Sequence, residues 1–246
     1  MPNQNHLRTI QYFWLVILGS VIASIAYALE IKGLYLTLSP IPALVGAYVV
    51  FNQTQDNGYE SGYSLSLMFA FALCSIGDVF FALEFVGLDA FYFISYVMFT
   101  LAHFCFVYAL VYGVPVSNIK TKRHWGQLAI ASVLIVCVVE IFVLNRDSFS
   151  TAILEISVYG TFLSLTAICA AMRMLHHGFE SYFTVLVGSV CFLTSDVFIV
   201  ITEFTEHLSW SVPIIIPLYY IGISLMVYGF SIGKPYSYTI PVKNGR

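Results

Sequence analysis

Charged residues are scarce in this sequence. Lysine, arginine, aspartate and glutamate make up only 9% of its 246 residues, whereas hydrophobic residues make up 59%. A soluble domain carries roughly 25% charged residues, so an ordinary water-soluble protein is excluded. The ten lysines and arginines form no large basic patch and the formal net charge is -3, so no nucleic-acid surface is indicated. The composition predicts an integral membrane protein.

Close cysteine pairs and common catalytic motifs are also missing. The five cysteines lie singly inside apolar stretches, so neither a disulfide framework nor a zinc site is indicated. The sequence contains no nucleotide-binding fingerprint, phosphate-binding glycine-rich loop, HExxH helix or serine elbow. Hydrolysis by an activated serine or by a metal ion is therefore disfavoured.

Long apolar runs dominate what is present. A transmembrane helix needs about twenty apolar residues, because each residue advances it by about 1.5 Å across about 30 Å of hydrocarbon. The runs give eight such spans, near residues 11–29, 34–51, 63–82, 90–112, 125–144, 150–172, 182–201 and 210–230. We expect an all-α fold: a polytopic bundle of about eight transmembrane helices, forming a single membrane domain over residues 1–246.

The distribution of positive charge predicts the orientation of these spans. Eight of the ten lysines and arginines lie on the side that carries both termini, and only Lys32 and Arg146 lie on the other. Both termini are therefore expected in the cytoplasm. An alternative stays open at the first span, because Ala26-Tyr27-Ala28 is similar to a signal-peptidase site and cleavage there would leave seven helices.

Two segments of the sequence are similar to each other, and we call this similarity the internal repeat. Gly77-Asp78-Val79-Phe80 lies in the third span, and Ser195-Asp196-Val197-Phe198 lies in the seventh. Four spans separate the two segments, so both helices should run in the same direction. A parallel duplication would put the two aspartates at matching depth, in the non-cytoplasmic half of the bundle. Chance similarity between two apolar helices is the competing explanation.

Acidic residues inside spans are the main candidates for chemistry. An aspartate at the centre of a transmembrane helix costs about 2.5–3.5 kcal/mol, so it needs a partner, water or a function. Asp78 and Asp196 qualify best, Glu140 is nearly as deep, and Glu155 lies nearer to a span end. A structural role is the alternative for each acid. Two carboxyl groups in one cavity could act as acid and base, because burial keeps one of them protonated.

A set of short motifs follows a recognisable order along the chain. A Gly-Asp in one span precedes a His and a Tyr five residues apart, then a further Tyr, and finally a Ser-Asp and a Tyr-Tyr. The residues are Gly77-Asp78, His103, Tyr108, Tyr159, Ser195-Asp196 and Tyr219-Tyr220. In this order and spacing the sequence resembles the YhhN-like lysoplasmalogenase family, from about the second span to the eighth.

Two positions depart from the pattern of that family. Ser39 precedes Pro40 where the family typically has a lysine, so a contact to a lipid head group is missing. Ile223 stands where the family usually has a glutamine, three residues after Tyr220. An altered substrate or an inactive relative is therefore a further alternative.

The resemblance implies hydrolysis of the vinyl ether bond of lysoplasmalogens, releasing a fatty aldehyde and glycerophosphoethanolamine or glycerophosphocholine. Asp78 and Asp196 would be the catalytic acid and base, in an order that the sequence does not assign. The residues expected to orient water or substrate are His103, Tyr108, Tyr159, Tyr219 and Tyr220, with Glu84 and Glu155 as candidate supporting acids. No metal or organic cofactor is required, and the expected partners are the lysophospholipid substrate and membrane lipids.

Location and function class keep some alternatives open. The resemblance implies the endoplasmic reticulum in a eukaryote and the inner membrane in a bacterium. A proton-coupled transporter or a lipid-binding receptor would also use acids near the middle of the membrane. A transporter would more often show inverted repeats and interrupted helices, and Pro213 and Pro217 could interrupt the eighth span.

Overall fold

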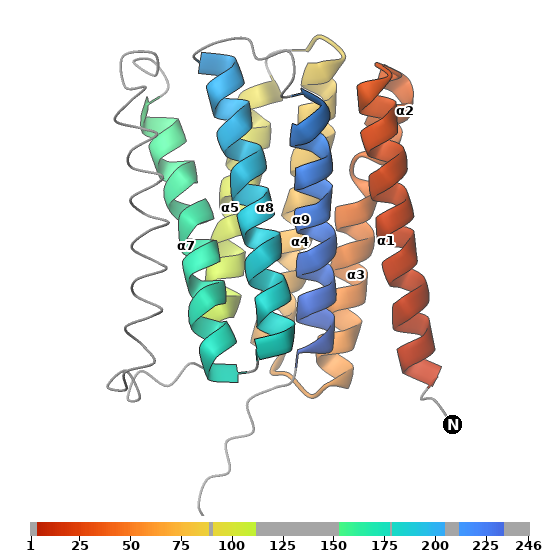
Figure 1. Cartoon of the computed structure of the whole chain (residues 1–246), viewed down its shortest axis with the longest axis vertical. Coiled ribbons are helices and arrows are strands. Elements are labelled where there is room, and N and C mark those ends of the chain that lie inside the picture. Colours follow the sequence, from red (N-terminus) through yellow and green to blue (C-terminus); the bar gives the residue numbers. More distant parts are fainter. Residues whose placement is uncertain (1–3, 89–90, 112–152, 178, 205–211, 234–246) are drawn as a thin grey trace, which may run out of the picture.

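The computed structural model describes residues 4–88, 91–111, 153–177, 179–204 and 212–233, and these residues form an upright bundle of helices (Figure 1). The described part contains eight α-helices and no strand. They are α1 (Gln4–Ala28), α2 (Lys32–Leu38), α3 (Ile41–Asp56), α4 (Ser61–Phe85), α5 (Tyr92–Val111), α7 (Ile153–His177), α8 (Phe179–Phe204) and α9 (Val212–Ile232).

Most of these helices are long and apolar enough to cross a membrane. Six candidate spans lie in the described residues: 32–56, 61–85, 92–111, 157–174, 181–202 and 214–232. The apolar part of α1, Phe13–Ala28, is shorter than these. The predicted polytopic helical bundle is confirmed. The predicted fifth span, residues 125–144, and Glu140 within it lie outside the described residues.

The second span is kinked rather than straight. Ser39 and Pro40 separate α2 from α3 but keep helical backbone angles, and the Ser39 N–H still donates to the carbonyl of Tyr35 at 2.8 Å. Pro40 and Pro42 have no N–H to donate, so the helical hydrogen-bond ladder is incomplete here. By contrast, α9 runs without a break through Pro217.

Side chains of neighbouring helices bond to the kink. The Tyr220 hydroxyl donates to the carbonyl of Ser39 at 3.2 Å, and Ser75 Oγ donates to the carbonyl of Pro40 at 2.9 Å. Ser39 is fully buried, and its own hydroxyl donates to the backbone carbonyl of Asp78 at 3.4 Å. The kink is therefore joined to α4 and α9 at the level of Asp78.

Six helices form a closed ring in the order α3, α4, α5, α7, α8 and α9, with α9 packing back on α3. Outside the ring, α1 packs against α9 and α3. Within the described residues α4 and α8 make no direct backbone contact, so they stand on opposite sides of the ring. A half turn of the ring would exchange α3 with α7, α4 with α8 and α5 with α9. This is the helix order that a parallel duplication predicts.

The two helices that carry the similar segments, α4 and α8, run in the same direction. Both α4 and α8 begin at the lower end of the bundle, where α1 begins and α9 ends, and both finish at the upper end (Figure 1). Asp78 lies seventeen residues after Ser61 in α4, and Asp196 lies seventeen residues after Phe179 in α8. The predicted matching depth follows from these equal distances along two parallel helices.

Glycines bring α8 and α9 into backbone contact. A Cβ atom added to Gly222 would lie 2.8 Å from the carbonyl oxygen of Gly188, and one added to Gly229 would lie 2.6 Å from that of Ser181. Small residues let membrane helices approach closely enough for van der Waals contact, which replaces the hydrophobic effect inside a bilayer. The register of α9 on α8 is thereby fixed, and with it the position of Tyr219.

A buried cation closes the lower end of the ring. Arg173 of α7 is 3% exposed, and its guanidinium lies 5.2 Å from the ring centroid of Tyr63 and 5.4 Å from that of Tyr182. One of its nitrogens donates to the carbonyls of Ala109 and Leu110, in the last turn of α5, at 3.4 and 3.2 Å. A cation over aromatic faces and at a helix C-terminus is favourably placed. It joins α4, α5, α7 and α8.

Replacing Arg173 by methionine is expected to destabilise the protein by about 2 kcal/mol or more, because the carbonyls of Ala109 and Leu110 lose a charged donor. Thermal unfolding in detergent micelles measures this. Arg173→Lys should recover part of the loss, since it keeps the charge but not the planar donor group. Equal stability of Arg173→Met and wild type would show that the cluster contributes nothing.

Candidate functional site

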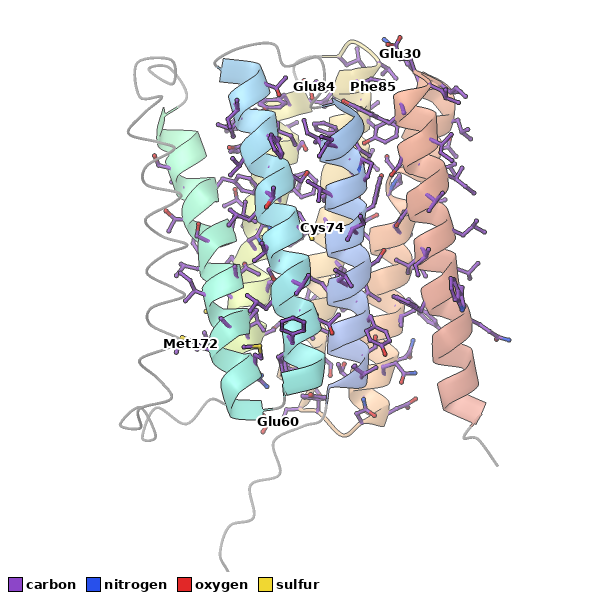
Figure 2. All side chains as sticks on the ribbon, in the orientation of Figure 1. Glu30, Glu60, Cys74, Glu84, Phe85 and Met172 are labelled. Atoms are coloured by element: carbon purple, nitrogen blue, oxygen red, sulfur yellow. The ribbon has the colours of Figure 1, made fainter. Side chains whose placement is uncertain are left out.

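Asp78 and Asp196 face the inside of the ring from opposite helices. Asp78 is 3% and Asp196 is 8% exposed. Asp78 lies one helical turn above Cys74, which is at mid-height in Figure 2, and so belongs to the upper half of the bundle. The ring therefore brings together the two acids that the sequence shortlisted.

Two small cavities lie beside these acids. The first, here called the Asp78 cavity, has a volume of about 30 Å³; its walls include Asp78, Asp196, Tyr35, Ser195, Tyr219 and Ile216. The second, the Tyr159 cavity, also measures about 30 Å³; its walls include Asp196, Tyr159, Tyr92, Ser95, Tyr96 and Val200. Each has room for about two water molecules, which need about 10–15 Å³ each. Asp196 borders both cavities, and so do Phe81, Phe99 and Ile199.

Asp196 has a hydroxyl donor. The phenol of Tyr159, on α7, donates a hydrogen bond to Oδ2 of Asp196. Tyr159 is itself held by aromatic contacts, with ring centroids 4.6 Å from Tyr96 and 5.8 Å from His103. The next residue back, Ser195, donates to the carbonyl of Ile215 at 2.9 Å and so fastens α8 to α9 beside the acid. Asp196 therefore has a fixed position and one oxygen already hydrogen-bonded.

Asp78 has different surroundings. Its Oδ2 is buried without a hydrogen-bond partner among the described residues, and so is the hydroxyl of Tyr219 on the wall of the same cavity. Buried polar atoms are nearly always hydrogen-bonded, so two such atoms in one cavity need an explanation. The Asp78 oxygen can accept a hydrogen bond, or donate one when it is protonated, and the Tyr219 hydroxyl can donate one. Both groups are available to a ligand that enters the Asp78 cavity.

Phe99 lines both cavities, and its ring packs against a glycine of α4 next to Asp78. A Cβ atom on Gly77 would lie 3.0 Å from two atoms of the Phe99 ring, closer than ordinary packing allows. Ser95, one turn before Phe99, donates to the carbonyl of Gly77 at 3.1 Å. The glycine of the Gly-Asp motif thus lets α5 approach α4 beside the acid.

Gly77→Ala is expected to push the Phe99 ring toward the cavities and to destabilise the protein by about 1–3 kcal/mol, as overpacking of a close contact does. The midpoint of thermal unfolding measures the effect. Gly33→Ala is the matched control, because no atom lies within 4 Å of a Cβ atom added at Gly33. If both alanine variants unfold at the wild-type temperature, the close contact with Phe99 does not limit the stability of the protein.

The other predicted site residues are less close to the cavities. Tyr220 is buried and bonds to the kink at Ser39. Tyr108 is 49% exposed on α5, so the structure does not bring it to the cavities. Glu84 lies at the upper end of α4 (Figure 2). Glu155 belongs to the first turn of α7, and its side chain is outside the described part.

His103 is buried but lies below the cavities, on neither of their walls. Its Nδ1 is 3.0 Å from Thr166 Oγ1, and Thr166 donates its own proton to the carbonyl of Phe162 at 2.9 Å. Nδ1 therefore donates to Thr166, and Nε2 has no partner among the described residues. The centroid of the imidazole lies 4.7 Å from that of the Phe192 ring and 5.8 Å from that of the Tyr159 ring. His103 therefore packs against Tyr159 from outside the cavities.

Sequence reasoning missed several residues of the cavity walls. Tyr35, Phe99, Ser95 and Tyr96 were not among the expected site residues. Tyr35 precedes Ser39 by four residues, so a shared helix face was a usable signal. Phe99 carries no polar group and has no sequence signal of its own.

No group of three or more His, Cys, Asp or Glu side chains that could hold a metal ion occurs among the described residues. The cavity walls offer two carboxyl groups, five phenols and space for water. This arrangement is suited to proton transfer to and from a small group that enters the ring.

A sequence model of the YhhN family matches residues 33–230, which include every helix from α2 to α9 among those described. The chain belongs to the YhhN family. This family contains the lysoplasmalogenases, and the match to a YhhN model agrees with the resemblance read from the motifs. The curated proteins and the solved structures contain no match to this chain.

Proposed function

We propose that this YhhN protein is a lysoplasmalogenase, which hydrolyses the vinyl ether bond of a lysoplasmalogen to a fatty aldehyde and a glycerophospho-alcohol. The observation that carries the proposal is the pair of buried aspartates. They face the interior of the ring from opposite helices, and both line the Asp78 cavity. Membership of the YhhN family supports the same reaction.

The different surroundings of the two acids support different roles. A hydrogen bond donated to a carboxylate favours its charged form, and Asp196 accepts one from Tyr159. The Oδ2 atom of Asp78 has no donor among the described residues, and a buried carboxyl group that is less fully hydrogen-bonded favours the neutral form, since burial of an isolated charge is costly. Asp78 therefore serves as the general acid and Asp196 as the general base.

The proposed reaction needs one water molecule and no other reactant. Asp78 transfers its proton to the β-carbon of the vinyl ether, which forms an oxocarbenium ion, and the Asp196 carboxylate stabilises this cation. Asp196 then removes a proton from water while the water oxygen bonds to the α-carbon. The hemiacetal collapses to the aldehyde as Asp78 regains the hydroxyl proton and Asp196 returns its proton to the glycerol oxygen. Paired carboxylates divide the work similarly in glycosidases.

Two of the phenols have supporting roles in this scheme. Tyr159 holds Asp196 in position, and the unpartnered hydroxyl of Tyr219 binds the ether oxygen or the water beside Asp78. The cavities as observed hold only water-sized groups, so the side chains that line both of them, Phe81, Phe99 and Ile199, move apart to make room for the vinyl ether. Water outside this small site stays excluded from the cation.

The test compares two lysophospholipids that differ only at the ether. Purified protein in lipid vesicles should release aldehyde from lysoplasmenylethanolamine, the vinyl ether, and none from its saturated alkyl ether analogue. Protonation of the β-carbon requires the double bond, so the alkyl ether is inert in this mechanism. Silence with both lipids would overturn the proposal. Proton-coupled uptake of a solute into the same vesicles without aldehyde would favour a transporter instead.

A further inference from the structure

A groove on the outside of the ring is much larger than the two cavities beside the aspartates. It lies between α1 and α9 and has a volume of about 400 Å³. Binding pockets for small molecules typically measure about 300–1,000 Å³. Its walls include Phe13, Ile17 and Val21 of α1 and Pro217, Tyr220 and Leu225 of α9. We call it the α1–α9 groove.

The polar side chains that line this groove already have hydrogen-bond partners; the hydroxyls of Ser20 and Ser224 lie 3.5 Å apart. Ser20 donates to the carbonyl of Val16 at 2.7 Å, and Ser24 donates to the carbonyl of Ser20 at 2.8 Å. The Tyr220 hydroxyl is directed to the carbonyl of Ser39, away from the groove. A hydrocarbon chain would therefore leave no hydrogen bond broken, whereas a polar ligand would find few partners.

Two adjacent tyrosines connect the wall of this groove with the wall of the Asp78 cavity. Tyr220 lines the groove and Tyr219 lines the Asp78 cavity, and the two rings touch with centroids 5.0 Å apart. Tyr220 is bonded to Ser39, and Ser39 in turn to the backbone of Asp78. The kink between α2 and α3 and the Tyr219-Tyr220 pair thus form the partition between the groove and the site.

The groove has the direction that a lipid chain needs. Its walls on α1 extend from Phe13 to Ile25, about 18 Å at about 1.5 Å per residue. Tyr220 lies toward the upper end of α9, at the level of the acids, and Leu225 lies lower. A lysophospholipid in the leaflet at the upper end of the bundle would have its head group uppermost and its chain pointing down this groove.

We propose that the α1–α9 groove binds the hydrocarbon chain of the lysophospholipid substrate, and that Tyr220 is the side gate between this chain and the aspartates. This inference rests on the proposed function. The chain is already in hydrocarbon before it binds, so the groove contributes shape fit and orientation rather than hydrophobic transfer. Its lower half, from Ile17 and Leu225 down to Phe13, then limits the chain length.

Photolabelling tests the chain site independently of hydrolysis. An alkyl ether lysophospholipid with a diazirine in its chain is added to vesicles that contain the full protein, and labelled peptides are mapped. We expect labelling of α1 and α9 that excess unlabelled alkyl ether lysophospholipid prevents. Equal labelling by a diacyl phospholipid probe, not reduced by the lysolipid, would mean surrounding lipid only and would overturn the proposal. Labelling confined to other helices would overturn it too.

A pair of variants tests the limit on chain length. Ile17→Trp should fill the lower groove, and Leu18→Trp should not, because Leu18 is 56% exposed and is not on the groove wall. A pocket that excludes a methylene group discriminates by about tenfold or more. In Ile17→Trp, the ability of an octadecyl lysolipid to compete with the probe should therefore fall by about tenfold or more relative to that of an octyl lysolipid. The same ratio in Ile17→Trp, Leu18→Trp and wild type would overturn the proposal.

The outcomes separate this inference from the proposed function. Competed labelling in the groove without any aldehyde release would leave a lysophospholipid chain site and overturn the hydrolase. Aldehyde release without labelling of α1 or α9 would keep the hydrolase and overturn the groove.

Discussion

Asp196→Asn is expected to reduce aldehyde release from lysoplasmenylethanolamine by at least about 100-fold, since general acid–base groups contribute about 10²–10⁴-fold. The amide keeps the size of the side chain and still accepts a hydrogen bond from Tyr159, but it cannot take a proton from water. Asp78→Asn should cause a loss of similar size, because the amide cannot donate a proton to the β-carbon. Initial rates of aldehyde formation measure both.

The control for these variants is Asp56→Asn, the same chemical change at an exposed position in the last turn of α3. It should keep the wild-type rate. Thermal unfolding of all three variants separates lost chemistry from lost folding. If both buried asparagine variants unfold normally and keep the full rate, the carboxylate mechanism is wrong even if the protein hydrolyses the lipid.

Gly222→Val is expected to have the largest effect on folding. A Cβ atom at this position would lie 2.8 Å from the carbonyl oxygen of Gly188 and 3.1 Å from the backbone nitrogen of Phe192, and backbone atoms cannot move aside as a flexible side chain can. Overpacking costs about 1–3 kcal/mol and more where the backbone must shift. We expect α9 to separate from α8, with little folded protein recovered.

Size-exclusion profiles and thermal unfolding in detergent measure the loss caused by Gly222→Val. Gly33→Val is the matched control, because the space around Gly33 is open within 4 Å. A Gly222→Val variant that elutes and unfolds as the wild type does would show that the glycine contact does not hold the two helices together.

The fold and the central acids were largely predictable from the sequence. Long apolar runs predict transmembrane helices because each span must satisfy its own backbone hydrogen bonds. The cost of burial selected Asp78 and Asp196, and the internal repeat around them predicted parallel helices at equal depth. The closed order of the ring is not readable from any local pattern, since it depends on which helices pack at long range.

The residues around the acids were harder to predict. His103 and Tyr108 are separated by five residues, which rotates the second side chain by about 140° from the first at about 100° per residue. They could not share a face, so the exposure of Tyr108 follows from helix geometry even though the motif names both. Tyr35 and Phe99 reach the cavities through tertiary packing, which leaves no local pattern.

The two departures from the family pattern have structural counterparts. Ser39 is fully buried and bonds to the backbone of Asp78, so the position of the missing lysine lies next to that residue. Ile223 is also fully buried in α9, one turn below Tyr219. Both departures replace a long polar side chain by a small or apolar one near the same end of the proposed site.

The ring is nearly symmetric in its helices but not in the hydrogen bonds that its tyrosines make to the acids. Asp196 receives its hydroxyl from α7, whereas the unpartnered hydroxyl in the Asp78 cavity comes from α9. A half turn would carry α7 onto α3 and α9 onto α5. Tyr35 of α2, in the same span as α3, and Tyr96 of α5 line the cavities there. Each phenol therefore has a tyrosine on the related span, and the asymmetry lies in the hydrogen bond from Tyr159 to Asp196. Two identical halves would give identical carboxyl groups, with nothing to decide which one holds the proton. In the proposed mechanism, the hydrogen bond from Tyr159 removes that degeneracy, so a repeated backbone would acquire a polarity along which the proton moves in one direction.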